Sequence, residues 1–354
     1  MAFVSKKIAA KEICCYFCTM TRFSDIQITP QMTTLEICAG AGGQALGLEQ
    51  AGFNNVALVE IEKDYCKTLM LNRPNWNVVW ADLRDFDGTA YFGKVDLLAG
   101  GVPCPPFSVA GKQLGKDDER DLFPEAIRLA KEIDPKVVML ENVRGLFDIK
   151  FEPYRQHIIN SFEDIGYTVQ WHLINSADFG VPQLRPRTVM IATKRDLGDF
   201  TFCPQKRIPQ TVGEAIYDLM SANGWKQVEN WKGVASKVAP TLVGGSKKHG
   251  GPDLGPTRAR KAWAELGIDG KGIADEAPKM DFDGMPRITC RMAARLQGFP
   301  DNWSFYGGKT LKYRQIGNAF PPPVAKEIGL MIKKYLENGN HNNVRKEELS
   351  QSIA

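Results

Sequence analysis

Residues 33–194 alternate short apolar, β-branched runs with segments that have the spacing of amphipathic helices. The apolar runs are typical of buried strands. They span residues 33–39, 55–61, 76–82, 95–101, 135–143, 167–175 and 187–194, and the first helical segments span 42–53 and 63–73. This alternation predicts an α/β fold with a doubly wound, mostly parallel sheet.

Chemically active residues follow several of the predicted strands where each strand ends. A glycine-rich turn follows the first strand, Glu60 lies at the end of the second, and Asp82 at the end of the third. Cys104 follows the fourth strand and Glu141 ends the fifth. Ligands of such sheets bind at the carboxyl ends of the strands, so we expect these residues to meet at one edge.

The alternation breaks near residue 199, which predicts a second, smaller domain. From there to about residue 286 the chain is irregular and rich in Gly, Pro and Trp, which predicts loops and short strands. Helical patterns return at 290–299 and 323–337. We expect an N-terminal extension (1–32), a larger domain (33–198 with 310–337), a smaller domain with its hinge (199–309), and a polar, frayed tail (338–354).

Composition narrows the class of protein. The chain has 43% hydrophobic and 24% charged residues, which is ordinary for a globular protein. No apolar run reaches the roughly 18 residues that span a bilayer, and the first residues do not resemble a signal peptide. We therefore expect a cytoplasmic protein, without a membrane segment, whose eight cysteines are mostly thiols. The Cys15-x-x-Cys18 pair has no second pair at zinc spacing, so we expect no metal site.

A basic stretch lies within the predicted smaller domain. The net charge of the chain is only +4, but residues 237–262 hold a single acid, Asp253. The basic residues there are Lys237, Lys247, Lys248, Arg258, Arg260 and Lys261. Such a stretch suits either a polyanion site or a solvated loop, and its composition alone leaves both open.

The turn after the first strand, EICAGAGGQALGLEQAG, joins a strand to a helix through glycines. Glycines there let a ligand approach the backbone at a helix N-terminus. The turn is neither a Walker loop nor a GxGxxG fingerprint, so a nucleoside triphosphate and a dehydrogenase are both disfavoured. With Glu60 placed to accept from a ribose and Asp82 from an adenine amino group, we expect an adenosine-containing cofactor.

The loop GGVPCPPFSVAG (100–111) places Cys104 between prolines. Prolines restrict the backbone, so the thiol is held in one direction, which suits a nucleophile or a structural turn. Glu141, in MLENVRG, belongs to the same predicted edge. In QLRPR (183–187), Arg185 and Arg187 are two residues apart, which predicts that both project from one face of an extended segment. A cysteine, a carboxylate and arginines at one rim form a chemically coherent set.

In these motifs and their order, the chain resembles the bacterial DNA (cytosine-5) methyltransferases of restriction–modification systems. AGAGG resembles the family's S-adenosylmethionine turn, GVPCPPFS its catalytic loop, ENV its glutamate motif, and QLRPR its arginine motif. RMAARLQGFPDNW and YRQIGNAFPPPVA resemble its last two blocks. The interval 199–286 is where the family keeps its target-recognition region. The chain departs from the family pattern at Glu36, Cys38, Pro105 and Ala319.

The resemblance implies methyl transfer from S-adenosyl-L-methionine to C5 of a cytosine flipped out of duplex DNA. It implies that Cys104 bonds to C6, that Glu141 holds N3 and the exocyclic amine, and that Arg187, with Arg185 beside it, holds O2. The implied cofactor-binding residues are Cys38, Ala39, Gly40, Gly43, Glu60, Ile61, Asp82, Leu83, Pro103, Leu122, Asn318 and Ala319. The implied DNA-binding residues are Ser108, Gln113, Lys247, Lys248, Arg258 and Arg260.

Two other functions fit some of the same residues. An RNA (tRNA) cytosine-5 methyltransferase shares the catalytic blocks, but its Cys-Phe-Thr signature is not found here. A non-catalytic DNA-binding relative is expected to lack Cys104, Glu141 or Arg187, and all three are present. For the favoured function we expect double-stranded DNA as partner, a monomer, and functional pairing with a cognate restriction endonuclease without a stable complex.

Overall fold

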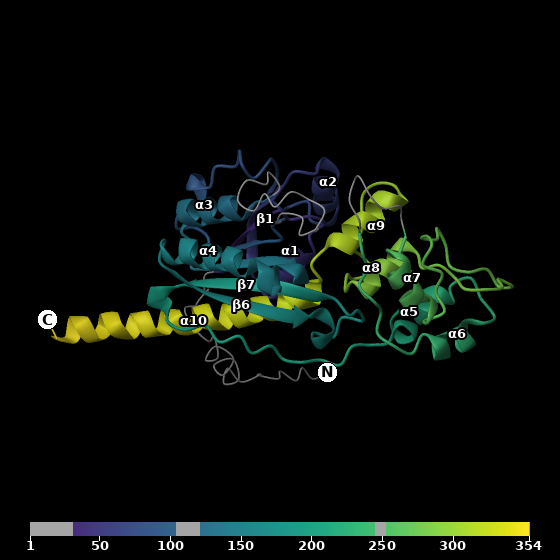
Figure 1. The fold of residues 1–354 in the computed structure, drawn as a ribbon. Helices are drawn as coiled ribbons and strands as arrows, with labels where there is room; N and C mark the ends of the chain where they lie inside the picture. The colour runs from purple at the N-terminus through teal and green to yellow at the C-terminus, as the bar shows by residue number, and fades with distance from the viewer. Residues whose placement is uncertain (1–30, 104–120, 245–252, 354) are drawn as a thin grey trace, which may run out of the picture. The chain divides into compact units, whose positions relative to one another are not determined.

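The computed structural model describes residues 31–103, 121–244 and 253–353, with side chains as far as residue 339. A seven-stranded sheet has the order β3-β2-β1-β4-β5-β7-β6. Strands β1 to β5 pair in parallel, whereas β7 is antiparallel to both β5 and β6. The predicted α/β fold with a mostly parallel sheet is confirmed (Figure 1). The strands are β1 (Thr33–Ile37), β2 (Asn54–Glu60), β3 (Val78–Trp80), β4 (Leu97–Gly100), β5 (Val137–Val143), β6 (Tyr167–Asn175) and β7 (Pro186–Lys194).

Helices cover both faces of this sheet, because side chains alternate between the faces along each strand. On one face, Leu98 packs with α3 (Phe123–Ile133) and α4 (Glu152–Glu163). On the other, Leu97 packs with α1 (Gly43–Gln50) and α10 (Pro322–Ile353). Helix α2 (Lys63–Asn72) packs near β2 through Leu69. Short 3₁₀ helices are η1 (Thr89–Tyr91), η3 (Arg144–Phe147), η4 (Ile149–Phe151), η5 (Ser176–Asp178) and η6 (Arg195–Leu197).

Helix α10 is longer than the sequence pattern predicts. The helix expected over 323–337 is present, but the frayed tail expected from Asn338 is wrong, since α10 continues to Ile353. The isolated Gly339 costs only about 1 kcal/mol of helix propensity, and no proline follows it. A polar composition therefore did not end this helix. Within the described ranges, no helix is long and apolar enough to span a membrane.

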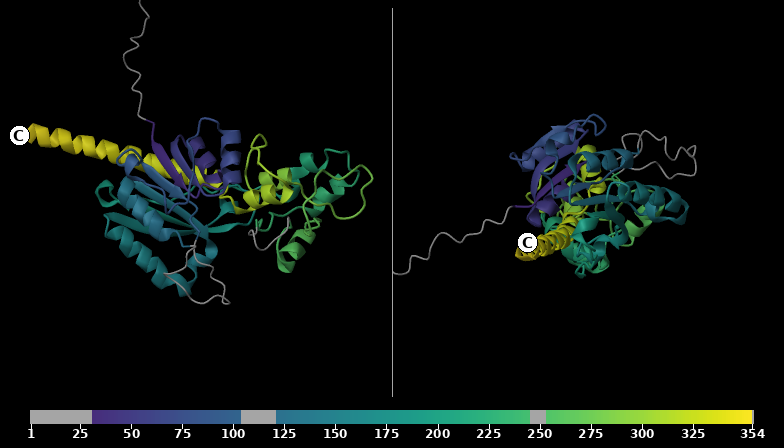
Figure 2. Two further views of the ribbon diagram at one scale, coloured as in Figure 1. Left: turned by 90° about the horizontal axis from the view of Figure 1, so that it is seen from above. Right: turned by 90° about the vertical axis from the view of Figure 1, so that its left-hand side faces the viewer.

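Residues 199–319 form a helical region with a core of its own. Its helices are α5 (Val212–Met220), α6 (Val228–Val234), α7 (Thr257–Ala264), α8 (Cys290–Leu296) and α9 (Lys309–Asn318). Four of its tryptophans are buried in one cluster: Trp225, Trp231, Trp263 and Trp303. The left view of Figure 2 shows these green helices gathered apart from the sheet. The expected loops are present between the helices of residues 199–286, but the expected short strands are wrong for the described part, where the β-pairing amounts to isolated bridges.

The core of the helical region extends past the predicted boundary at residue 310. Tyr313 and Ile316, on α9, are buried in the same cluster as Trp263 and Trp303. Ala41 and Leu46, from the start of α1, also belong to that cluster. The helical region is therefore built against the turn that follows β1, and α9 packs with it.

Candidate active site

A cavity of about 620 Å³ lies at the carboxyl ends of the parallel strands. It brings together residues that follow β1, β2, β3, β4 and β5, as the sheet topology requires. Every residue predicted for the cofactor lines it: Cys38, Ala39, Gly40, Gly43, Glu60, Ile61, Asp82, Leu83, Pro103, Leu122, Asn318 and Ala319. Glu141, predicted as catalytic, lines the same cavity.

The turn between β1 and α1 forms the inner wall of the cavity. Cys38, Gly40 and Gly42 have φ angles of 52°, 57° and 83°, in the left-handed region that favours glycine. A Cβ on Gly43 would lie 2.1 Å from the carbonyl oxygen of Phe320, so only glycine lets α1 approach that segment. Burial raises the pKa of the Cys38 thiol, and the carboxylates of Glu60, Asp82 and Glu36 raise it further. Cys38 is therefore a neutral wall residue rather than a thiolate.

Glu60, at the end of β2, both faces the cavity and holds the turn. Its Oε2 accepts from the Gly40 backbone N–H at 2.7 Å, and its Oε1 accepts from the Glu62 N–H at 2.8 Å. Burial raises the pKa of Glu60, and these backbone hydrogen bonds oppose the rise. The carboxylate is thus fixed in direction before any ligand enters.

Asp82 and Ile61 form the outer rim. The Arg84 guanidinium donates to Asp82 Oδ2 at 2.9 Å, and the Arg84 backbone N–H donates to Oδ1 at 3.0 Å. The indole N–H of Trp80 donates to the Ile61 carbonyl at 2.9 Å. Ile61 itself is 56% exposed, which leaves an apolar surface at the mouth for a flat ring.

Glu141 and Arg187 form a buried ion pair between neighbouring antiparallel strands. Arg187 Nε lies 2.7 Å from Glu141 Oε1, and both side chains are nearly nine-tenths buried. Burial lowers the pKa of Arg187, whereas the Glu141 carboxylate opposes that change. The structure therefore brings Glu141, which lines the cavity, and Arg187 into direct contact.

The chain that leads to Cys104 passes beside Glu141. A Cβ on Gly101 would lie 3.4 Å from Glu141 Oε2. The Asn142 amide donates to the Val102 carbonyl at 2.9 Å, and the Leu122 N–H donates to the Pro103 carbonyl at 3.2 Å. Both ends of the segment 104–120 are thereby tied to the wall that carries Glu141. Cys104, Ser108 and Gln113 themselves lie outside the described residues.

Arg185 and Arg187 have different hydrogen-bond partners, and the expectation that both project from one face stays a prediction. Arg185 is fully buried, and its guanidinium donates to the carbonyls of Leu242 (2.8 Å), Gly317 (2.7 Å) and Ala319 (3.1 Å). Burial lowers the pKa of Arg185 and the Arg187 charge lowers it further, whereas Glu141 opposes that change, so the three groups lie within electrostatic reach of one another. In this structure Arg185 joins the sheet to the end of α9.

A pair of buried glutamines completes that junction. The Gln183 amide donates to Gln297 Oε1 at 2.6 Å, and Gln297 donates to the Ala319 carbonyl. Gln183 Oε1 accepts from the Leu242 N–H at 2.8 Å. The QLRPR, RLQGF and QIGNAF segments are therefore linked by one polar network at the back of the cavity.

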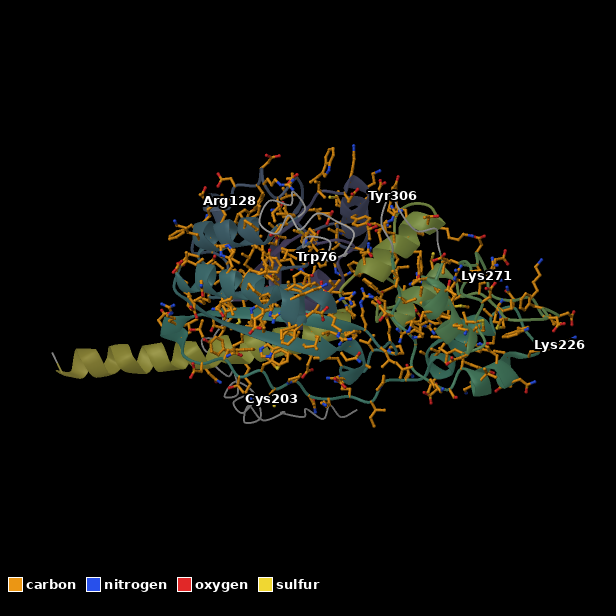
Figure 3. The ribbon with its side chains drawn as sticks, in the orientation of Figure 1. Trp76, Arg128, Cys203, Lys226, Lys271 and Tyr306 are labelled. Atoms are coloured by element: carbon orange, nitrogen blue, oxygen red, sulfur yellow. The ribbon has the colours of Figure 1, made fainter. Side chains whose placement is uncertain are left out.

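The residues predicted to contact nucleic acid are only partly within the described ranges. Arg258 and Arg260 lie on α7, with Arg258 exposed and Arg260 half-buried. Arg260 makes a weak contact with Thr257 Oγ1 at 3.4 Å. Lys226 and Lys271 add positive charge to the same helical region (Figure 3). Lys247 and Lys248 lie outside the described residues.

Sequence reasoning missed several residues that line the cavity. They include Glu36, Gln44, Tyr65, Arg84, Gln315 and Phe320. Gln44 and Tyr65 lie in the first turns of α1 and α2, so a search limited to the residues at strand ends does not find them. Gln315 is placed by tertiary contacts alone: it accepts from Thr68 Oγ1 at 2.5 Å and donates to the Tyr306 carbonyl at 2.8 Å.

The described lining of the cavity holds more acidic than basic side chains. Glu36, Glu60, Asp82 and Glu141 line the cavity, and the cationic lining side chain among the described residues, Arg84, is paired with Asp82. Burial raises the pKa of Glu36 well above its ordinary value, and Glu60 contributes to the rise. Such a lining favours a cationic ligand and disfavours a pyrophosphate.

Known proteins resemble this chain over most of its length. Residues 32–334 match the model of the C-5 cytosine-specific DNA methylases. The Type II methyltransferase M.NgoMIV of Neisseria gonorrhoeae is 57% identical over 315 residues, which cover 88% of this chain and 100% of the relative. The Type II methyltransferase M.NaeI of Lentzea aerocolonigenes is 51% identical over 312 residues, which cover 86% and 75%.

Solved structures share the fold. A prophage-encoded protein of Escherichia coli superposes with a TM-score of 0.62 at 25% identity, covering 86% of this chain and 99% of the other. DNMT2 of Spodoptera frugiperda superposes with a TM-score of 0.61 at 18% identity, covering 85% and 99%. The second likeness shows the fold alone.

Proposed function

Because this chain belongs to the C-5 cytosine-specific DNA methylase family, we propose that it methylates C5 of a cytosine flipped out of double-stranded DNA, with S-adenosyl-L-methionine as donor and a covalent Cys104–C6 bond as intermediate. Its class is that of the DNA (cytosine-5) methyltransferases. One observation supports the mechanism: Glu141 lines the same cavity as the predicted cofactor residues and is paired there with Arg187.

The residues of the cavity fit S-adenosyl-L-methionine. Glu60 is oriented to accept from ribose hydroxyls, Asp82 lies where an adenine amino group would donate, and Ile61 offers an apolar surface to the ring. The acidic lining suits a ligand that carries a sulfonium and an ammonium charge. When bound, this cofactor supplies an electrophilic methyl group.

The protein's own groups would prepare cytosine to accept that methyl group. The Cys104 thiolate forms a bond to C6, and the electron pair of the C5–C6 double bond makes C5 nucleophilic. A Glu141 carboxyl that has taken up a proton would hold the exocyclic amine and pass that proton to N3, which limits the negative charge on the ring; it would take the proton back when the Cys104–C6 bond breaks. Arg187, held by Glu141 at 2.7 Å, would donate to O2. After methylation, the C5 proton leaves to a base and the Cys104–C6 bond breaks, restoring the aromatic ring.

The burial of the proposed base-binding groups supports a cytosine that leaves the DNA stack. Glu141 and Arg187 are nearly nine-tenths buried, so a base within a duplex would not reach them. The helical region, with Arg258 and Arg260 on α7, would contact the duplex. Its relatives M.NgoMIV and M.NaeI are named Type II methyltransferases, which supports pairing with a restriction endonuclease. Cellular DNA as substrate supports a cytoplasmic location.

A trapping experiment tests this function. Duplex DNA with 5-fluorocytosine at the target position should form an adduct that survives denaturation and requires S-adenosyl-L-methionine, because fluorine is not released as a cation. Cys104→Ser should abolish the adduct, since a hydroxyl is a far weaker nucleophile at neutral pH. Cys203→Ser, an exposed free thiol, is the control and should still trap.

Two outcomes would contradict the proposal. An adduct that maps to another cysteine would remove Cys104 from the mechanism. Trapping on tRNA in preference to duplex DNA would favour the RNA methyltransferase.

A further inference from the structure

Gln44 carries a buried donor that has no partner within the protein. Its side chain lines the cofactor cavity, and the residue is only 3% exposed. Its amide nitrogen makes no hydrogen bond. A buried, unpaired amide donor costs about 1–3 kcal/mol, so such a group in a cavity wall indicates a partner that arrives with the ligand.

Gln44 lies beside the cavity at the start of α1. It is the second residue of the eight-residue helix Gly43–Gln50, and the N-cap, Gly42, offers no side-chain cap. The first-turn N–H groups of a helix have no partners within the helix, and side chains there lean toward the helix N-terminus. The Gln44 amide and these N–H groups therefore belong to the same end of α1.

The start of α1 also offers a place where an anionic group could bind in a cavity lined by carboxyl groups. The one anionic group of the proposed cofactor is its α-carboxylate, and the described lining holds the carboxyl groups of Glu36, Glu60, Asp82 and Glu141. A carboxylate is stable there only beside donors, and the positive end of a helix favours it. A second unpartnered atom, Glu36 Oε2, lines the same cavity as an acceptor, which suits the neighbouring ammonium group.

We propose that Gln44 binds the α-carboxylate of S-adenosyl-L-methionine through its Nε2 donor, together with the first-turn N–H groups of α1. The inference rests on the proposed function. It makes Gln44 a determinant of selection for the amino-acid end of the cofactor, separate from Glu60 and Asp82 at the nucleoside end.

Two nucleosides distinguish binding of the amino-acid end of the cofactor from binding of its nucleoside end. S-adenosylhomocysteine carries the amino-acid end, and 5′-methylthioadenosine lacks it. Titration calorimetry on the full chain should show that Gln44→Leu weakens S-adenosylhomocysteine binding by about tenfold or more, the loss expected for a hydrogen bond to a charged group. Binding of 5′-methylthioadenosine should stay within about twofold of wild type.

Two further variants complete the test. Gln44→Glu keeps the size of the side chain but replaces donors with a carboxylate, so it should weaken S-adenosylhomocysteine binding further and again spare 5′-methylthioadenosine. Gln50→Leu, an exposed glutamine on the same helix, is the matched control and should bind both ligands as wild type does. Retained binding of 5′-methylthioadenosine reports that each variant is folded.

A structural role for Gln44 predicts a different pattern. If Gln44→Leu weakens both ligands equally, or weakens neither, the inference is wrong. The melting temperature of the ligand-free Gln44→Leu protein should equal or exceed that of wild type, because leucine leaves no donor unpaired. Wild-type protein that binds neither nucleoside would overturn the proposed function itself, whereas wild-type binding without sensitivity to Gln44 overturns this inference alone.

Discussion

The sheet edge and the helical region differ in how they hold their functional groups. At the sheet edge, Glu60 and Glu141 lie in regular strands, and their directions follow from strand pairing and from hydrogen bonds to neighbouring backbone. In the helical region, Arg258 lies exposed on α7, a helix of eight residues built over a tryptophan-rich core. Under the proposed function, the reacting groups lie on the strands of the sheet and the groups that contact DNA lie on an exposed helix face.

Glu141→Gln should have the largest effect and should act on the chemistry alone. The amide still fills the site but does not deliver a proton to N3, so we expect kcat to fall by about 10²- to 10⁴-fold. Affinity for S-adenosylhomocysteine should change little, because Glu141 lies at the base-binding side of the cavity. Single-turnover methylation and calorimetry measure the two quantities. Equal losses in kcat and in affinity for S-adenosylhomocysteine would show that Glu141 does not act on the chemistry alone.

Arg185→Ala should act on the junction between the two regions. It leaves the carbonyls of Leu242, Gly317 and Ala319 without their buried donor. We expect the free energy of unfolding to fall by about 3–5 kcal/mol, as when one partner of a buried charged group is removed. Arg187→Ala is the paired variant, and it should lose methylation. Urea unfolding compares them, and a catalytic role for Arg185 would instead appear as lost kcat at unchanged stability.

Glu36→Gln should make the ligand-free protein more stable at higher pH. Burial raises the pKa of Glu36 in the folded protein, so the folded state holds a proton that the unfolded state has released. The stability from this group is present below the unfolded pKa and is lost as pH rises, by up to about 1.4 kcal/mol per pH unit. Glu36→Gln removes that loss. Urea unfolding at pH 5.5 and pH 8 should show the larger gain at pH 8, and an equal gain at both would contradict the assignment.

Arg258→Ala should have the smallest effect, and only on the recognition side. If Arg258 contacts phosphate, the slope of log K against log salt should fall by about 0.9, with DNA affinity reduced for all sequences alike. Loss at one base position only would indicate a base contact instead. Lys226→Ala is a useful comparison, because Lys226 pairs with Asp281 at 2.5 Å. Unchanged salt dependence for Arg258→Ala would indicate that this part of α7 is a solvated surface that does not contact DNA.

Much of the sheet and its site could be predicted because the relevant signals are local. Apolar runs mark strands, parallel strands end at one edge, and so the residues after those ends line one cavity, as the cofactor residues do. The helical region could not be predicted in the same way. Its capping box at Thr211 and Glu214 was a readable helix signal, but the surrounding Gly and Pro content suggested loops.

The arginine motif shows that spacing along the chain does not predict which distant groups a side chain contacts. Arg185 and Arg187 are two residues apart, yet one holds carbonyls of Leu242 and α9 while the other pairs with Glu141. The spacing of two residues does not predict which carbonyls or which carboxylate each arginine meets, because those partners come from segments distant in the chain.

By itself, the sequence determined the order of strands and helices along most of the sheet, the residues at the strand ends and the family, since each depends on residues close together in the chain. The tertiary structure alone decided that Gln183, Arg185 and Gln297 form a buried junction and that Gln315 and Gln44 reach the cavity. These roles arise where segments distant in the chain pack together and water is excluded, so that each polar group must find its partner across the fold.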